Sequence, residues 1–239
     1  MQQEWMNRVV HDALHYGIAV NEKQREQLNS YANMLVEWNE NVNLTSIIDD
    51  EGIAIKHFVD SFTAVPYLKP HTQIIDVGTG AGFPGIPFAI VRPDVHVVLL
   101  DSLDKRVKFL QEVLKKLDMK NIHAYHSRAE DFAKQLQWRE RFDVSVARAV
   151  ANLPVLIEYC LPFVKVGGVF IAMKGQDAEK EIQSSQKALQ VLGGKVVKED
   201  HFQLPGTDME RTLIIIEKIV KTPKNYPRKS GKPSKDPMI

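Results

Sequence analysis

From residue 73 onward, short apolar runs with the character of strands alternate with segments of helical spacing. Such alternation is typical of a parallel sheet whose strands are joined by crossover helices. The clearest helix is expected over residues 104–117, and two others over 153–164 and 178–192. We therefore expect an α/β fold with helices on both faces of a seven-stranded sheet. The expected strands are residues 73–78, 95–101, 121–127, 142–148, 168–175, 195–204 and 212–219.

The end of the chain indicates where this parallel pattern breaks. Only the loop LPGTDMER separates the last two expected strands. A parallel pair needs a crossover of about a dozen residues or more, whereas a short loop is enough for an antiparallel pair. We therefore expect a mostly parallel sheet with one antiparallel strand.

The segment before residue 73 has helical spacing and no strand pattern. A helix is expected over residues 22–40, with Asn21 as its cap, and a shorter one over residues 1–16, ended by Gly17. A further apolar helix is expected near residues 53–62. The buried face of the helix over 22–40 is expected to consist of Leu28, Tyr31, Leu35 and Trp38.

The chain divides into three parts. We expect an N-terminal helical extension packed on the core over residues 1–66, the sheet domain over 67–220 and a basic Pro-rich tail over 221–239. Hydrophobic residues make up 44% and charged residues 26%, as in an average globular protein. No apolar run approaches the roughly 18 residues of a membrane span, and charged residues interrupt any N-terminal signal core. We therefore expect a cytoplasmic protein with no membrane segment.

The net charge of +1 hides an uneven distribution. From Lys218 to the end there are seven Lys or Arg residues and one acid, a balance of +6, which leaves −5 for the rest of the chain. A basic segment suits contact with phosphates, although charge alone is equally compatible with a solvated tail that aids solubility. Four prolines restrict its backbone, which favours a docked or binding segment. Lys224, Arg228 and Lys229 are the candidate substrate contacts.

The most informative local segment is DVGTGAGFPG, residues 76–85, which follows the first strand and opens a helix. Glycines there allow a sharp turn and the close approach of a ligand. They stand at Gly78, Gly80 and Gly82, whereas a dinucleotide fingerprint needs the third at position 83, which is Phe83. The pattern favours S-adenosylmethionine over a nicotinamide dinucleotide, and a purely structural glycine turn is the alternative.

Acidic residues at the ends of the first three strands complete the expected cofactor site. Asp76 can help to neutralise the ammonium group of this cofactor, and Asp101 can accept hydrogen bonds from ribose hydroxyls. After the third strand, a backbone amide and a carboxylate at Ala129 and Glu130 can read the adenine ring. Phe83 either packs on the cofactor or fills the core.

Several motifs together carry a family resemblance. They are NVNLTS (41–46), HFVDS (57–61), DVGTGAGFPGIP (76–87), LLDSLDKRVKFL (99–110), SRAED (127–131), ARA (147–149) and PKNYPRKSGKPSK (223–235). These motifs resemble the glucose-inhibited division protein B family, the ribosomal RNA small-subunit methyltransferases G, over nearly the whole chain. The resemblance implies a Rossmann-like class I fold and methyl transfer from S-adenosylmethionine to N7 of one guanine in the 530 loop of 16S rRNA, position 527 in standard numbering. The implied partner is 16S rRNA, naked or within the 30S subunit.

The sequence agrees with methylation of guanine N7 mainly because residues that other methylation targets require are absent. Cys160, the only cysteine, lies within an expected helix, where a buried inert thiol is expected rather than the nucleophile of pyrimidine methylation. After the fourth strand, residues 148–151 read RAVA, not the Asn/Asp-Pro-Pro-aromatic segment usual for methylation of an adenine amine. Guanine N7 has an exposed lone pair and no proton to lose. We therefore expect no general base, and rate enhancement from proximity and orientation.

Five positions are candidates for contacts at the reacting centre. Arg148, after the fourth strand, is expected to orient guanine through O6 or to contact the cofactor carboxylate, and its loss should impair transfer while leaving the fold intact. Arg128 is the second candidate, for a phosphate or base contact. Asn43 either contacts RNA or caps a helix. His57 and Asp60 either present one helix face to the substrate or form a hydrogen-bonded pair.

Other interpretations stay open at this point. The eight histidines are scattered without carboxylates at ligand spacing, so no metal site is expected. The acceptor could instead be another RNA, a protein or a small molecule, or the chain could be a noncatalytic ribosome-assembly factor. A nicotinamide-dependent oxidoreductase is disfavoured by Phe83. A monomer is expected, because a face that docks on RNA must stay free.

Overall fold

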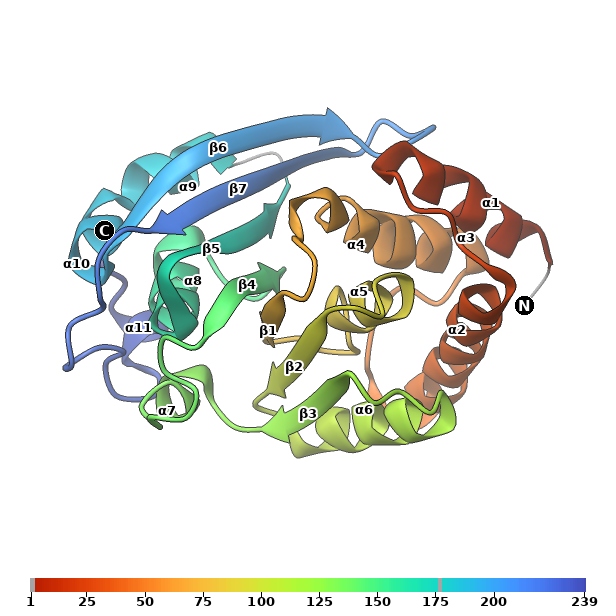
Figure 1. Ribbon diagram of the computed structural model, residues 1–239, viewed down its shortest axis with the longest axis horizontal. Coiled ribbons are helices and arrows are strands. Elements are labelled where there is room, and N and C mark those ends of the chain that lie inside the picture. Colours follow the sequence, from red (N-terminus) through yellow and green to blue (C-terminus); the bar gives the residue numbers. More distant parts are fainter. Residues whose placement is uncertain (1–2, 176–177) are drawn as a thin grey trace.

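The computed structural model describes residues 3–175 and 178–239, and the strands of these residues form one sheet (Figure 1). Its order is β3-β2-β1-β4-β5-β7-β6. Each of the seven expected strands is present, with shifted ends. Their bounds are β1 Gln73–Val77, β2 His96–Asp101, β3 Ile122–His126, β4 Phe142–Arg148, β5 Val164–Lys174, β6 Gly194–Gln203 and β7 Glu210–Lys218.

One strand runs against the others. All neighbouring pairs from β3 to β5 are parallel, whereas β7 is antiparallel to both β5 and β6, which confirms the expected pairing of the last two strands. Because β7 runs in the opposite direction, its first residues lie beside the last residues of β5, and Thr212 pairs with Lys174. The carboxyl ends of the parallel strands and the amino end of β7 therefore meet at one edge of the sheet.

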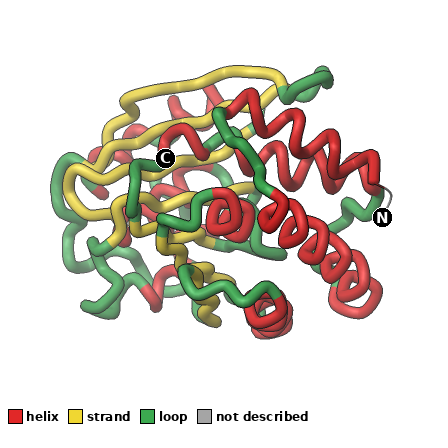
Figure 2. The backbone as a smooth tube through the Cα atoms, turned by 45° about the vertical axis from the view of Figure 1, so that its right-hand side comes forward, coloured by secondary structure: helices red, strands yellow, loops and turns green. Residues whose placement is uncertain are grey.

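Side chains of each strand alternate between two hydrophobic cores, one on each face of the sheet. In β1, Ile74 belongs to one core and Ile75 to the other, and Leu213 and Ile214 of β7 divide in the same way. Helices pack on both faces, as expected, and Figure 2 shows them against the strands. The first core includes α5 (Gly85–Val91) and α6 (Asp104–Lys116), and the second includes α8 (Leu153–Cys160) and α10 (Gln186–Leu192).

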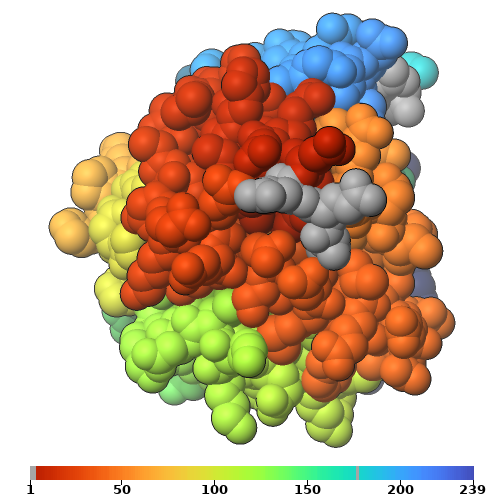
Figure 3. Space-filling view, turned by 90° about the vertical axis from the view of Figure 1, so that its right-hand side faces the viewer, coloured from red at the N-terminus to blue at the C-terminus, as the bar shows by residue number. Residues whose placement is uncertain are grey.

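The N-terminal helices belong to the first core. Trp5, Leu28 and Tyr31 are buried in the same cluster as Phe109 of α6. In Figure 3 this segment, coloured red to orange, forms most of one face of the molecule. Among the described residues, no helix is both long and apolar enough to cross a membrane. The elements are α1 Gln3–Ala13, η1 Leu14–Tyr16, α2 Glu22–Val42, α3 Asp50–Gly52, the π-helical η2 Ile53–Val59, α4 Asp60–Phe62 and η3 Val65–Tyr67.

Two expected boundaries in this segment are confirmed. Gly17 ends η1 in the left-handed conformation, with φ of 72°. The side chain of Asn21 accepts a hydrogen bond from the N–H of Gln24, whose side chain accepts one from the N–H of Asn21. This reciprocal capping box satisfies two N–H groups at the start of α2.

Two expected helices are wrong in part. The helix expected over 153–164 ends at Cys160, a 3₁₀ turn η4 (Leu161–Phe163) follows, and β5 begins at Val164 rather than at 168. Pro162 lies in this turn and has no N–H to continue a helix. The helix expected over 178–192 is divided at Ser185 into α9 (Ala178–Ser184) and α10, because the Ser185 hydroxyl donates to the Glu181 carbonyl (2.6 Å) and competes with the helical pattern.

The basic tail is docked on the sheet domain. The guanidinium of Arg139 donates to the carbonyls of Thr222, Pro223 and Tyr226. The tail then forms the short helix α11 (Lys232–Lys235), and the side chain of Met238 is buried in the second core. The tail is therefore a docked segment and not a solvated one.

Candidate active site

The glycine segment forms a tight turn at the carboxyl edge of the sheet, between β1 and α5. Gly78 and Gly82 have φ of 72° and 105°, in the left-handed region that residues with a Cβ rarely adopt. The N–H of Gly78 donates to the carbonyl of Leu100 (2.8 Å), and the N–H of Gly80 donates to Oδ2 of Asp101 (2.9 Å). The turn is thereby tied to the end of β2.

A cavity lies beside this turn, at the ends of β1 and β2 and at the start of α7 (Ala129–Phe132). We name it the cofactor cavity, because the sequence predicts the cofactor contacts at these residues. Asp101 and Glu130 are buried in its wall, whereas Arg128 is exposed. Both oxygens of Asp101 accept backbone N–H groups, but a carboxylate offers about four acceptor positions, so Asp101 can still accept from a ribose. Five of the predicted residues line this cavity: Gly78, Asp101, Arg128, Ala129 and Glu130.

Asp76 lies two residues before Gly78 and is completely buried. Its Oδ2 accepts hydrogen bonds from the Thr79 hydroxyl (2.6 Å) and the Gly85 N–H (2.8 Å), while its Oδ1 has no partner among the described residues. Burial raises the pKa of Asp76 to about 6, although these two bonds act in the opposite direction. A buried carboxylate with an unpaired oxygen fits the ammonium group of S-adenosylmethionine, which would supply the missing donor.

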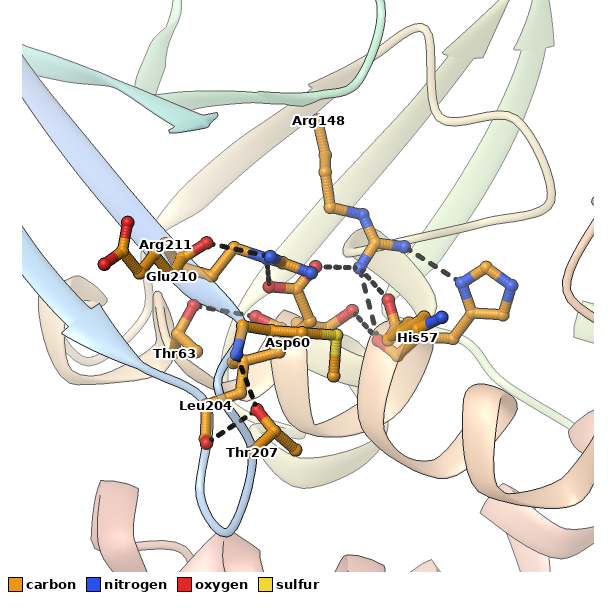
Figure 4. Close-up of polar contacts among 11 residues, drawn as sticks. His57, Asp60, Thr63, Arg148, Leu204, Thr207, Glu210 and Arg211 are labelled. Atoms are coloured by element: carbon orange, nitrogen blue, oxygen red, sulfur yellow. Dashed lines mark hydrogen bonds and ion pairs between the residues drawn. The ribbon is translucent and has the colours of Figure 1, made fainter. Parts of the chain in front are cut away.

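Arg148 ends β4, and its side chain reaches the N-terminal helical segment (Figure 4). Its Nη1 donates to Oδ2 of Asp60 (3.0 Å) and to the carbonyls of Lys56 and His57 (3.0 and 3.4 Å). Nε of Arg211, on β7, donates to the other oxygen of Asp60 (2.9 Å). One buried carboxylate therefore joins two guanidinium groups. The side chain of Arg148 is only 13% exposed, so the expectation that its loss leaves the fold intact is not supported by these interior contacts.

His57 is buried within this cluster in its neutral form. Burial and the nearby charge of Arg148 lower the pKa of His57 to about 3. Its Nδ1 lies 3.5 Å from Nη2 of Arg148, which can only donate, and its Nε2 lies 3.0 Å from the Thr45 hydroxyl. We therefore assign the proton to Nε2. His57 and Asp60 share a helix face, as considered from the sequence, and Arg148 is the group that joins them.

A second cavity, of about 440 Å³, adjoins this cluster. Such a volume lies within the range of small-molecule sites. Ala149 lines this cavity, and the next residue, Val150, lines the cofactor cavity. The two cavities therefore meet at the segment that follows β4. Its polar lining residues, among those that the structure describes, are Lys56, His57, Asp60, Arg148, Lys174, Glu181 and Arg211.

Other predicted residues line neither cavity. Asn43 is exposed and ends α2 in a left-handed conformation (φ 49°), which matches the helix-end alternative. Phe83 is only 5% exposed and stacks on the rings of His57 and Tyr31, with centroids 4.4 and 5.1 Å away.

The tail residues differ among themselves. Nη2 of Arg228 lies 2.7 Å from the carboxylate of Glu158, whose side chain is 1% exposed, so this guanidinium is engaged within the protein. In contrast, Lys224 and Lys229 are exposed.

Arg211 and Lys174 were missed from the sequence. Both lie at the edge where the candidate site forms, because β7 begins where β5 ends. The short loop before β7 already indicated an antiparallel strand. Topology was therefore the available signal: the first residues of an antiparallel strand belong at the edge where its parallel neighbours end.

One group of described residues could hold a metal ion. His11, Asp12 and His15 bring ligand atoms within 4.8 Å of one another, and the side chain of Asp12 already pairs with Arg8. The two histidines are four residues apart with Asp12 beside them, so this group differs from the expectation that no histidines lie with carboxylates at ligand spacing. These residues line a separate cavity, which shares no lining residue with the cofactor cavity.

Cys160 lies inside the second core. Its side chain is fully buried, and burial raises the pKa of the thiol well above its usual value. The expectation of a buried thiol is confirmed.

The chain matches the family model described as rRNA small subunit methyltransferase G over residues 24–213. A protein named ribosomal RNA small subunit methyltransferase G from Acetivibrio thermocellus is 53% identical over 231 residues, which are 96% of this chain and 95% of that protein. The protein of the same name from Alkaliphilus metalliredigens is 50% identical over 224 residues, 93% of this chain and 94% of that protein.

Solved structures share the fold at much lower identity. M. jannaschii TYW2 in complex with AdoMet matches with a TM-score of 0.54 and 14% identity, over 67% of this chain and 75% of that one. The YcgJ protein from Bacillus subtilis matches with a TM-score of 0.52 and 13% identity, over 69% of this chain and 100% of that one. At these identities the matches concern the fold alone.

Proposed function

Because the chain belongs to the rRNA small subunit methyltransferase G family and is therefore an rRNA methyltransferase, we propose that it methylates N7 of a guanine in the 530 loop of 16S rRNA, with S-adenosylmethionine as the methyl donor. The observation that carries this proposal is the cavity beside the glycine turn. Four predicted residues converge there, although the chain between the first and the last of them spans two strands and two helices: Gly78, Asp101, Ala129 and Glu130.

The residues of this cavity, together with the buried Asp76 two residues before Gly78, have distinct roles towards the cofactor. The glycine turn admits it closely, Asp101 accepts from its ribose, and the backbone of Ala129 with the carboxylate of Glu130 reads its adenine. The unpaired oxygen of Asp76 accepts from its ammonium group. When bound, S-adenosylmethionine supplies an electrophilic methyl group on a positively charged sulfur.

Transfer to N7 needs placement of the base rather than removal of a proton. N7 offers a lone pair, so the protein has only to hold the base in line with the methyl group. The histidine of the second cavity, His57, is neutral and has protein partners on both nitrogens. We assign to Arg148, whose guanidinium is held by Asp60, the role of orienting the guanine through O6. We therefore assign no general base.

Exposed basic side chains supply the contacts to the RNA backbone. Lys56 lies at the second cavity, Arg128 at the cofactor cavity, and Lys224 and Lys229 on the docked tail. Binding through such contacts weakens steeply as salt concentration rises. We propose that the protein acts in the cytoplasm as a monomer, without a metal ion, on 16S rRNA or the 30S subunit.

The test is transfer of labelled methyl groups to 16S rRNA, offered naked and as 30S subunits from cells that lack this protein. Chemical strand scission then maps N7-methylguanine. Label at one guanine of the 530 loop is the expected result, and the better substrate form shows when in assembly the enzyme acts. Label at another base or atom overturns the assigned target, and binding to the 30S subunit without any transfer indicates an assembly factor.

A further inference from the structure

We propose that Glu181 is the specificity-determining residue that reads the Watson–Crick edge of the target guanine in the second cavity, an inference that rests on the proposed function. N7 must face the methyl group, so the common bidentate contact of an arginine to O6 and N7 is not available. The other distinguishing groups of guanine are the N1–H and the 2-amino group. Both are donors, and a carboxylate is the side chain that only accepts at neutral pH.

Among the described residues, two carboxylates line the second cavity, and Glu181 is the one with an oxygen for which no hydrogen bond is described. Both oxygens of Asp60 are engaged, Oδ2 by Arg148 (3.0 Å) and Oδ1 by Arg211 (2.9 Å), and its side chain is 7% exposed. Asp60 therefore serves to hold the two guanidinium groups. Glu181 is the other carboxylate.

Glu181 is held by one oxygen. Its Oε2 accepts from the N–H of Leu153 (2.5 Å) and from Nζ of Lys174 (2.8 Å), and no hydrogen bond of Oε1 is described. The side chain of Glu181 is 21% exposed and lines the cavity, whereas that of Lys174 is 10% exposed. Leu153 and Lys174 fix the carboxylate through Oε2 and leave Oε1 to accept a hydrogen bond from a ligand.

The position of Glu181 couples base recognition to the reacting centre. Leu153 and Ala151, whose backbone groups bond to Glu181 and Lys174, belong to the segment after β4 that separates the two cavities. Ala149 and Val150 of the same segment line one cavity each. A guanine held at its Watson–Crick edge by Glu181 thus lies next to the cofactor cavity, where a base extruded from its stack can present N7.

The test compares guanosine with inosine at the target position of an RNA carrying the 530 loop. Inosine keeps N7, O6 and N1–H but lacks the 2-amino group. Two readouts are used: the ratio of kcat/KM for the two RNAs, and the ratio of their affinities for the protein, measured by fluorescence anisotropy without methyl transfer. For the wild type we expect both ratios to favour guanosine by about 10- to 100-fold, as for one lost hydrogen bond to a charged group.

Two variants distinguish recognition of the guanine by Glu181 from structural support of the segment after β4. Glu181→Gln keeps the size of the side chain and an acceptor for the Leu153 N–H, and we expect both ratios to fall to within about 3-fold of unity. Lys174→Met removes the ion pair but keeps the carboxylate, so it should lower activity and retain the preference for guanosine. Thermal unfolding and S-adenosylmethionine affinity verify that each variant is folded.

Three outcomes would overturn the proposal. The first is a wild type that uses the guanosine and inosine RNAs equally, and the second is a Glu181→Gln variant that keeps the full preference for guanosine. The third is a Lys174→Met variant that loses this preference as fully as Glu181→Gln is expected to, which would assign the preference to the segment after β4. Absence of transfer to any guanosine RNA contradicts the proposed function instead. The affinity ratio still tests Glu181 in that case.

Discussion

Nη1 of Arg148 lies 3.0 Å from Oδ2 of Asp60, so the end of a central strand is joined to the N-terminal helical segment by an ion pair largely shielded from water. The same carboxylate binds Arg211 at the start of β7. The N-terminal helices therefore complete the edge of the sheet where the candidate site forms. An ion pair of this kind strongly penalises loss of one partner, because the other charge stays buried.

For Arg148→Ala, we expect lower stability together with a large loss of methyl transfer. Breaking a buried ion pair costs about 3–5 kcal/mol, and Asp60 keeps Arg211, so the lower end of this range is expected. Arg148→Lys restores a charge but not the planar fork, and should recover stability more than activity. Urea unfolding and a transfer assay measure the two effects. Arg128→Ala, at an exposed position, is the control; if it is equally unstable, the ion pair is not the cause.

His57 makes stability depend on pH. An unfolded histidine takes up a proton near pH 6.5, whereas the pKa of folded His57 is about 3. Between these values the unfolded state binds more protons, so stability decreases as pH falls, by at most about 1.4 kcal/mol per pH unit. His57→Gln should remove this slope in urea unfolding from pH 7 to 4. An identical slope in wild type and variant would contradict the assignment, and His123→Gln, at an exposed position, should leave it unchanged.

Asp76→Asn should raise the stability of the protein and weaken cofactor binding. The folded pKa of about 6 is above the ordinary 3.8, so the ionised form is disfavoured in the folded state above pH 6, on the order of 2–3 kcal/mol. Asparagine still accepts from Thr79 and Gly85. The variant should be more stable at pH 8 but not at pH 3, and should bind S-adenosylmethionine at least about 10-fold more weakly. Unchanged affinity in calorimetry would show that Asp76 does not contact the cofactor.

The basic side chains of the tail should separate into two functions. Arg228→Ala leaves the carboxylate of Glu158 buried, and we expect a loss of about 3 kcal/mol in the free energy of unfolding. Lys224→Ala and Lys229→Ala should change stability by less than about 0.5 kcal/mol and reduce the salt dependence of RNA binding by about one unit of slope each. If all three variants behave alike in both assays, the tail has a single role.

The local pattern of the chain predicted much of the fold. Alternation of strands and helices led to the sheet, and the short loop before β7 led to its antiparallel pairing. Helix ends were less accurate where a single residue decides them, as at Pro162 and Ser185. Pro162 lacks the N–H of one helical hydrogen bond and Ser185 makes one competing hydrogen bond, and periodicity over a whole window does not resolve such single bonds.

The sequence by itself determined the class of fold and the segments that form the cofactor cavity, because strand periodicity and glycine spacing are local properties and the ends of parallel strands must meet at one edge. The tertiary structure alone decided the partners of the charged groups. Asp60 lies 88 residues from Arg148 and 151 from Arg211, and Glu158 lies 70 from Arg228. No periodicity connects such positions. Packing brings them together, and removal from water makes each buried carboxylate depend on the arginine beside it.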